Sequence, residues 1–386
     1  MRQEIRLNPA EWVGASAEDV LDSVEYMIIK LDKKDFRINR LEKMEIVDDH
    51  IFIFDNWQGA IFVFRISGDF VSRIENLSGK WGRGAKFKIG SFTIDSKRNL
   101  VIVESTDDND NFFYQFTYDG KFISILPKPR IYHSSFKVLN NGNYLFYQNP
   151  PYKIKDSVVN NMYHVIEYDS LMQLSNHYIP SDTSERMDVF YDYVDNIFMS
   201  GDNNSVYVTN YYSYELYDIS NKNNINSYMF VLPLANSISK KYMDRKGSIE
   251  FVQYLKQNEK IIFGFNDIYR VDNNLFIRTL SAMKTHLIGE VDNIFAYNLH
   301  SKILLSLNKI QPSKISHNIP LFYDSRGVIS VDRGFVYTYF LSSELTNLGV
   351  KLDDLASGFI KSMLESDTSW DDGFILIGKY HFKGDL

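Results

Sequence analysis

Short apolar runs alternate with short polar turns along most of the 386-residue chain. One unit, made of a turn, an aromatic or β-branched run, a second turn and a second run, occurs six times. Within each run the apolar residues fall at every second position, which is typical of a strand with one buried face. The first halves of the six units are DDHIFIFD (48–55), KRNLVIVE (97–104), NGNYLFYQ (141–148), NNSVYVTN (203–210), NNLFIRTL (273–280) and RGFVYTYF (333–340).

The second halves of the units alternate in the same way and complete the repeat. They are AIFVFRISGDF (60–70), NFFYQFTYDGKF (111–122), YHVIEYDSLMQL (163–174), SYELYDISNKNN (213–224), NIFAYNLHSKIL (293–304) and GFILIGKYHFKG (373–384). Repeats of roughly 40–70 residues with four strands each indicate a β-propeller. The sequence therefore predicts one all-β domain over residues 1–386, a six-bladed propeller of four-stranded antiparallel blades.

The first unit gives the clearest strand boundaries. A Gly68-Asp69 turn joins its last two strands, and Asp119-Gly120 makes the same turn in the second unit, which is a strong hairpin signal. The four strands of the first unit are expected at Ile38–Val47, Ile51–Phe54, Ile61–Ile66 and Phe70–Ile74.

The two ends of the chain are expected to close the ring together. The run Phe374–Tyr380 begins the second half of the last unit, but no outer strand follows it. The run Val24–Leu31 is a strand that precedes the first unit and has no blade of its own. We expect these two runs to pair, because a closed ring hides strand edges that would otherwise promote aggregation.

Four segments do not follow the strand pattern. Residues 1–23 form an N-terminal extension before the closing strand. Apolar residues at helical spacing predict two small amphipathic helical insertions, at about 247–257 and 352–364. A long loop is expected within the third blade at Asn149–Met162, which contains Pro150.

Composition is that of a folded protein and argues against nucleic-acid binding. The chain is 44% hydrophobic and 24% charged, and its formal net charge is −7. Its basic residues are dispersed instead of forming a stripe. No apolar run is long enough to predict a transmembrane segment. The absence of cysteine excludes disulfides and thiolate metal sites.

The sequence contains no catalytic or metal-binding motif that we can assign. HExxH, GxSxG and Walker A patterns are absent, and the eight histidines do not have the spacing of paired ligands. The densest acidic cluster, Asp107–Asn111, fails the EF-hand spacing and is expected to be a solvated turn. We therefore expect no metal site, no catalytic residue that can be named and no cofactor.

Blades one and two carry motifs like those of NHL-type repeats. The motifs are Gly79–Phe87 (GKWGRGAKF), Phe92–Asp95 (FTID), Asn99–Val103 (NLVIV) and Phe116–Phe122 (FTYDGKF). In these motifs and in its first and last strands, the chain resembles the six-bladed β-propeller proteins of polysaccharide-degrading gut bacteria. It departs from that family after Gly84, where Ala85-Lys86-Phe87 replaces the usual Gly-Pro-Gly-Glu.

The resemblance implies a location and a broad role. It implies an extracytoplasmic protein, periplasmic or at the cell surface, with a lipid anchor on a cysteine upstream of this chain. The leading hypothesis is an exported, non-catalytic binding or scaffold protein associated with glycan recognition or uptake. Two alternatives stay open: a glycan-active hydrolase or lyase that uses carboxylates at the channel mouth, and a platform for protein partners.

Aromatic side chains in the predicted loops are the candidates for ligand binding. In a propeller, the links between blades and the turns between the second and third strands of each blade share one face. Planar rings beside hydrogen-bonding groups suit the C–H faces and hydroxyl rims of sugars, although such rings also cap the apolar layers between blades. We expect six residues to share this face, and several of them to contact a glycan or other small polar ligand: Trp57, Arg83, His133, Tyr152, Tyr191 and Tyr211.

Overall fold

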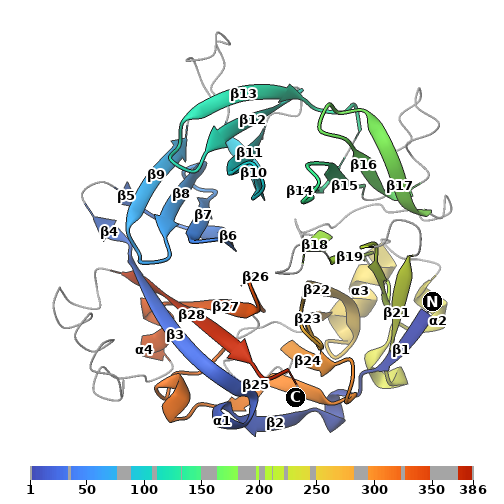
Figure 1. Cartoon of the computed structure of the whole chain (residues 1–386). Helices are drawn as coiled ribbons and strands as arrows, with labels where there is room; N and C mark the ends of the chain where they lie inside the picture. Colours follow the sequence, from blue (N-terminus) through green and yellow to red (C-terminus); the bar gives the residue numbers. More distant parts are fainter. Residues whose placement is uncertain are drawn as a thin grey trace.

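Six β-sheets form a ring around a central axis in the computed structural model of the chain (Figure 1). The predicted six-bladed propeller is therefore confirmed. The structure describes residues 2–33, 36–75, 88–106, 111–131, 133–148, 163–180, 197–199, 205–210, 212–220, 225–243, 249–281, 294–322, 327–347 and 373–384.

Each blade has four antiparallel strands that lie side by side, in order from the axis outward, and the observed strands follow the predicted units (Figure 1). The first three blades are β6 (Leu41–Val47), β7 (His50–Asp55), β8 (Ala60–Arg65) and β9 (Phe70–Glu75); β10 (Ile89–Asp95), β11 (Leu100–Ser105), β12 (Phe112–Thr117) and β13 (Phe122–Pro127); and β14 (Ser135–Val138), β15 (Tyr144–Tyr147), β16 (Tyr163–Tyr168) and β17 (Leu174–Pro180).

The other three blades complete the ring. They are β18 (Ile197–Met199), β19 (Val206–Thr209), β20 (Glu215–Asp218) and β21 (Asn226–Val231); β22 (Ile262–Val271), β23 (Asn274–Ser281), β24 (Ile294–Asn298) and β25 (Leu304–Gln311); and β26 (Ser330–Asp332), β27 (Phe335–Leu341), β28 (Phe374–Phe382) and β3 (Leu21–Lys30). A short hairpin of β4 (Asp32–Lys33) and β5 (Phe36–Arg37) follows β3.

The closing strand lies where the sequence predicts it. β3 pairs antiparallel with β28, from Phe374 opposite Lys30 to Phe382 opposite Leu21. Apolar side chains from both strands are buried, among them Ile29 and Ile375. The last blade is thus completed by a strand from the opposite end of the chain.

The N-terminal extension has more structure than the sequence indicates. β1 (Arg2–Arg6) pairs in parallel with β21, and β2 (Val13–Ser16) pairs in parallel with β25. Blades four and five therefore have five strands each. A continuous N-terminal segment covers the outer edges of three successive blades before the first complete blade begins.

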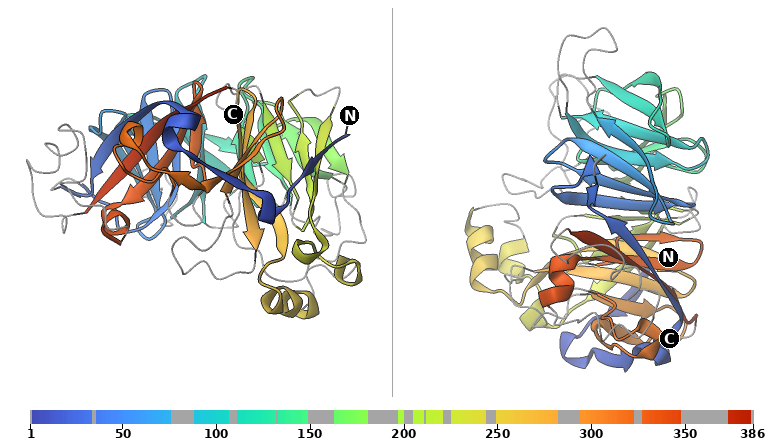
Figure 2. Two further views of the ribbon diagram at one scale, coloured as in Figure 1. Left: turned by 90° about the horizontal axis from the view of Figure 1, so that it is seen from below. Right: turned by 90° about the vertical axis from the view of Figure 1, so that its left-hand side faces the viewer.

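Short helices lie outside the ring. They are η1 (Pro9–Glu11), α1 (Ala17–Val20), η3 (Leu234–Asn236), α2 (Lys240–Met243), α3 (Ile249–Gln257), η4 (Lys314–Ser316) and α4 (Ser342–Asn347). α3 matches the first predicted insertion and buries Phe251 and Leu255, whereas the second, at 352–364, lies outside the described residues. α2, α3 and α4 project from one face of the ring (Figure 2). None of the helices in the described ranges has the length and apolar content needed to cross a membrane.

Polar side chains tie the inner strands of neighbouring blades to one another. Ser330 of β26 donates from its hydroxyl to the Ile46 carbonyl and accepts from the Ile46 amide. The Tyr269 hydroxyl of β22 donates to the carbonyl of Ile329, next to β26. These bonds join the inner strands of blades five, six and one to one another next to the channel.

Candidate functional site

The inner strands of all six blades surround a cavity of about 1020 Å³ on the axis. Its walls come from β6, β10, β14, β18, β22 and β26, together with several links between blades. The size falls within the range of small-molecule sites in proteins. The cavity is therefore the leading candidate for a ligand site.

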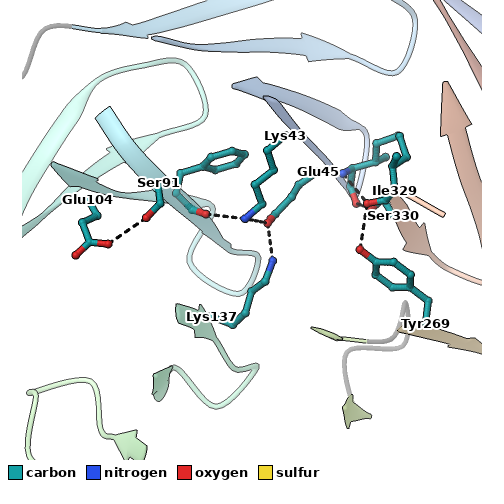
Figure 3. Close-up of polar contacts among 10 residues, drawn as sticks. Lys43, Glu45, Ser91, Glu104, Lys137, Tyr269, Ile329 and Ser330 are labelled. Atoms are coloured by element: carbon teal, nitrogen blue, oxygen red, sulfur yellow. Dashed lines mark hydrogen bonds and ion pairs between the residues drawn. The ribbon is translucent and has the colours of Figure 1, made fainter. Parts of the chain in front are cut away.

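Alternation along β6 explains why charged side chains line this cavity. Met44 and Ile46 are buried between blades. Lys43 and Glu45 lie at the intervening positions, where a strand presents its opposite face. That opposite face turns toward blades two and three, and because β6 is an innermost strand both side chains reach the cavity wall (Figure 3).

Two lysine ammonium groups share the Glu45 carboxylate. Nζ of Lys137, on β14, lies 2.7 Å from Oε1 of Glu45, and Nζ of Lys43 lies 2.9 Å from the same oxygen. Lys43 also donates to the carbonyl of Phe92 on β10, at 3.1 Å. Burial alone would raise the pKa of Glu45, but Lys137 and Lys43 outweigh it and lower that pKa to about 2. Glu45 is thus ionised throughout the physiological pH range.

A second cluster forms around Glu104, at the end of β11. Lys128 Nζ and His133 Nε2 each lie 3.1 Å from Oε1 of Glu104, and the Ser91 hydroxyl donates to Oε2 over 3.1 Å (Figure 3 shows the Ser91 contact). Burial would raise the pKa of Glu104, but His133 and Lys128 lower it to about 2. This cluster has the same arrangement as the first, with one carboxylate between two basic side chains.

Basic groups outnumber acidic ones among the described residues that line the cavity. Each of the two clusters sets two basic side chains against one carboxylate. Counted without histidine, the wall carries five cations and four carboxylates. The cations are Lys43, Lys88, Lys128, Lys137 and Arg278, and the carboxylates are Glu42, Glu45, Glu104 and Asp267. The lining therefore has a small positive excess that suits an anionic group.

Five buried polar atoms of the cavity lining have no hydrogen-bond partner among the described residues. Two of them, Nε2 of His133 and Nε of Arg278, lie beside a carboxylate. The other three are Nδ1 of His133, Oγ of Ser134 and Oδ1 of Asn266. Buried polar atoms in folded proteins nearly always have a partner, from the protein or from water. A ligand or water molecule in the cavity would supply these missing bonds.

Two of the six residues predicted to bind ligand lie in the described part of the chain. His133, in the link between β13 and β14, lines the cavity beside Glu104. Trp57, in the turn between β7 and β8, is 73% exposed and does not line the cavity, although its neighbour Asn56 does. Arg83, Tyr152, Tyr191 and Tyr211 lie outside the described residues. A ligand-binding role for the six stays a prediction.

The aromatic pattern of the predicted loops does not point to the charged residues of the inner strands. The signal was present in LEKMEIV (41–47), where Lys43 and Glu45 alternate with buried residues. Such a pattern is normally the solvated face of a strand, and it becomes a channel wall only because β6 is innermost. The pairing of Glu45 with Lys137 carries no local sequence signal.

No group of metal-ligating side chains occurs within the described ranges. The acidic cluster that begins at Asp107 falls mainly outside these ranges, so its role as a solvated turn stays a prediction. The chemistry that the described site offers is charge recognition and hydrogen bonding.

Comparison with protein families gives one match that covers most of the chain. A family model described as a 6-bladed beta-propeller matches residues 7–299, about three-quarters of the sequence. A comparison with curated proteins gives no match.

Two solved structures resemble this chain over nearly their whole length. The first is a Bacteroides fragilis protein that is named as an exported protein. It has a TM-score of 0.66 and 16% sequence identity, and the match covers 98% of this chain and 99% of the other. The second is a member of the DUF4221 family from Bacteroides vulgatus, with a TM-score of 0.50, 10% identity, and coverage of 94% and 99%. At these identities the likeness establishes the fold alone.

Proposed function

The chain belongs to the family of six-bladed β-propellers whose model it matches, and we propose that it is an exported, non-catalytic protein that binds a small anionic ligand in its central cavity. Acidic sugars are the ligand class that we favour. Export is suggested by the name of the Bacteroides fragilis protein of similar fold and by the resemblance to propellers of gut bacteria.

The observation that carries the proposal is the shared Glu45 carboxylate. Two ammonium groups, those of Lys43 and Lys137, lie within 3 Å of one carboxylate oxygen in a partly enclosed wall. Together the side chains of Lys43, Lys137 and Glu45 carry one more positive than negative charge. A ligand carboxylate, sulfate or phosphate next to them would gain charge-assisted hydrogen bonds.

A sugar fits the remaining features of the wall better than a bare ion does. The cavity volume is several times that of a simple inorganic anion, and hydroxyl groups of Ser91, Ser134 and Ser330 lie on its lining. Trp57, which is exposed next to Asn56 of the lining, would contribute a ring for stacking on sugar C–H faces. Ligand sites commonly combine aromatic side chains with a few placed polar groups such as hydroxyls.

The charge states of two lining carboxylates, Glu45 and Glu104, favour binding over catalysis. A glycosidase needs one carboxyl group that is protonated near neutral pH and acts as a general acid. Glu45 and Glu104 have pKa values near 2 and stay ionised. Asp332, whose pKa burial raises to about 6, lies at the turn between β26 and β27 and does not line the cavity.

Calorimetric titration with glucuronate and glucose tests this proposal. We expect glucuronate to bind at least about tenfold more tightly than glucose, because only the acid can pair with the lysines. Lys137→Met should remove most of that preference. Lys379→Met is the matched control, since Lys379 also lies within 2.8 Å of a glutamate, Glu25, but far out in blade six. Equal binding of both sugars, or equal effects of the two substitutions, would overturn the proposal.

A further inference from the structure

The wall that blade five contributes to the cavity departs from regular strand pairing. Asn266 pairs with Arg278 and Tyr269 pairs with Phe276, so β22 has one residue more than β23 between these positions. Asp267, inside this bulge, has a φ of +47°, a left-handed conformation that non-glycine residues rarely adopt. Bulges and strained residues of this kind often aim side chains at functional sites.

The Asp267 side chain is held in one position. Its Oδ2 lies 2.6 Å from Nε of Arg278, and both side chains line the cavity. Gly327 packs directly against it, since a Cβ atom at this position would lie 2.8 Å from Oδ2 of Asp267. Only glycine therefore fits at 327 without displacing the carboxylate.

Asn266, on the same wall, has a side-chain oxygen without a hydrogen-bond donor among the described residues. It is 5% exposed, it lines the cavity, and its Oδ1 receives no hydrogen bond from the described residues. A buried amide oxygen left in this state destabilises the fold, because it has lost its bonds to water without replacement. It is an acceptor that a donor group on a ligand in the cavity would satisfy.

We propose that Asn266, with the Asp267–Arg278 pair beside it, forms a second subsite that accepts a hydrogen bond from the ligand. The inference rests on the proposed function, in which Lys43 and Lys137 hold the anionic group of the same ligand. The ligand class that satisfies both walls is an anion that also carries hydroxyl or amide N–H groups. Sugar acids belong to that class, whereas simple carboxylates do not.

The charge of this wall supports a donor-binding role. The carboxylate of Asp267 already pairs with the guanidinium of Arg278, so blade five offers no net positive charge to an anion. A hydroxyl or amide N–H group needs only an acceptor of fixed orientation, which Asn266 supplies. The two walls of the cavity therefore differ in the ligand group that they recognise.

Calorimetry with glucuronate and cyclohexanecarboxylate separates the two walls, because these acids share a six-membered ring and a carboxylate but only glucuronate carries hydroxyl groups. We expect wild-type protein to bind glucuronate at least about tenfold more tightly, which corresponds to one hydrogen bond to a buried acceptor. Asn266→Leu should abolish that preference while it leaves the affinity for cyclohexanecarboxylate unchanged.

Substitutions at two glycines test the subsite without changing Asn266. Gly327→Ala should displace Asp267 and reduce the preference for glucuronate. Gly264→Ala, also next to this wall in β22, should not, because its Cβ would meet only Leu280 Cδ1 at 3.6 Å. Melting temperatures of all three variants show whether any loss of binding reflects unfolding.

The outcomes distinguish this inference from the proposed function on which it rests. Equal affinity of the wild type for the two acids overturns the second subsite and leaves the lysine site intact. A preference that survives in Asn266→Leu also overturns it. Binding of neither acid overturns both proposals together.

Discussion

The Lys137 ammonium lies 2.7 Å from the Glu45 carboxylate, and this contact joins blade three to blade one past the intervening blade. Lys43 extends the connection to the intervening blade through the Phe92 carbonyl. One cluster of three side chains thus links three blades on the cavity wall. The cluster ties these three blades together, and in the proposed function it also presents charge to a ligand.

Glu45→Gln should separate these two roles. The substitution removes the carboxylate that both ammonium groups contact on a largely buried wall, and we expect it to destabilise the fold by about 3 kcal/mol. The same change should strengthen binding of a ligand carboxylate, because the lysines are no longer neutralised in part. Denaturant unfolding and calorimetry measure the two effects. Glu25→Gln, which breaks the more exposed pair with Lys379, should cost about 1 kcal/mol or less.

Acid should destabilise the protein through the same carboxylates. The folded-state pKa values of Glu45 and Glu104 are about 2, below the ordinary 4.5. Their contribution to the free energy of unfolding is therefore complete above pH 4.5 and is lost as the pH falls from 4.5 to 2. It amounts to about 3 kcal/mol for each group. The pKa of Asp332 is raised to about 6, so its effect on the free energy of unfolding has the opposite sign. Ionised Asp332 destabilises the folded state above pH 6, and this destabilisation disappears as the pH falls from 6 to 3.8.

The control for the acid effect is the double variant Glu45→Gln/Glu104→Gln. Its free energy of unfolding should fall less steeply between pH 4.5 and pH 2 than that of the wild type. Parallel curves for the two proteins would show that these carboxylates have ordinary pKa values in the folded state.

The architecture was predictable because every blade repeats the same local pattern. Alternating runs such as HIFIFD (50–55) mark strands, and polar turns such as Asp119-Gly120 mark hairpins; Gly120 adopts a φ of +79°. The pairing of β3 with β28 was predictable because β3 precedes the first blade and the last blade lacks an outer strand of its own. The strands of the N-terminal extension were not predictable, because β1 and β2 are short and pair in parallel with distant edges.

Trp12 and Trp57 are the same residue type in opposite environments. Trp12 is 4% exposed and its ring lies 5.4 Å from that of Phe295, so Trp12→Ala should cost about 3–5 kcal/mol. Trp57 is 73% exposed, so Trp57→Ala should change stability by at most about 0.5 kcal/mol. If Trp57 binds ligand as proposed, its removal should weaken glucuronate binding alone. Unchanged affinity in Trp57→Ala would remove it from the site.

Stepwise N-terminal truncation tests the role of the edge strands. Removal of residues 1–16 deletes β1 and β2 and exposes the edges of β21 and β25, which should lower the melting temperature. Removal of residues 1–32 also deletes β3 and opens the last blade, and we expect lost solubility. A monomeric 33–386 fragment with the melting temperature of the full chain would contradict the closure of the ring.

The candidate site was only partly accessible to sequence reasoning. His133 was placed correctly in a link between blades, but its position beside Glu104 depends on the packing of blade two against blade three. Lys43 and Lys137 are separated by 94 positions in the sequence numbering and meet through Glu45 alone. Local patterns specify which strand faces the channel only after the order of strands within each blade is known.

A crystal structure of the protein with glucuronate tests the central claim most directly, because it locates the anion. We predict the sugar in the central cavity, with its carboxylate within about 3.2 Å of the ammonium group of Lys43 or Lys137. A cavity that stays free of sugar at saturating glucuronate, or a carboxylate bound away from both lysines, would contradict the account.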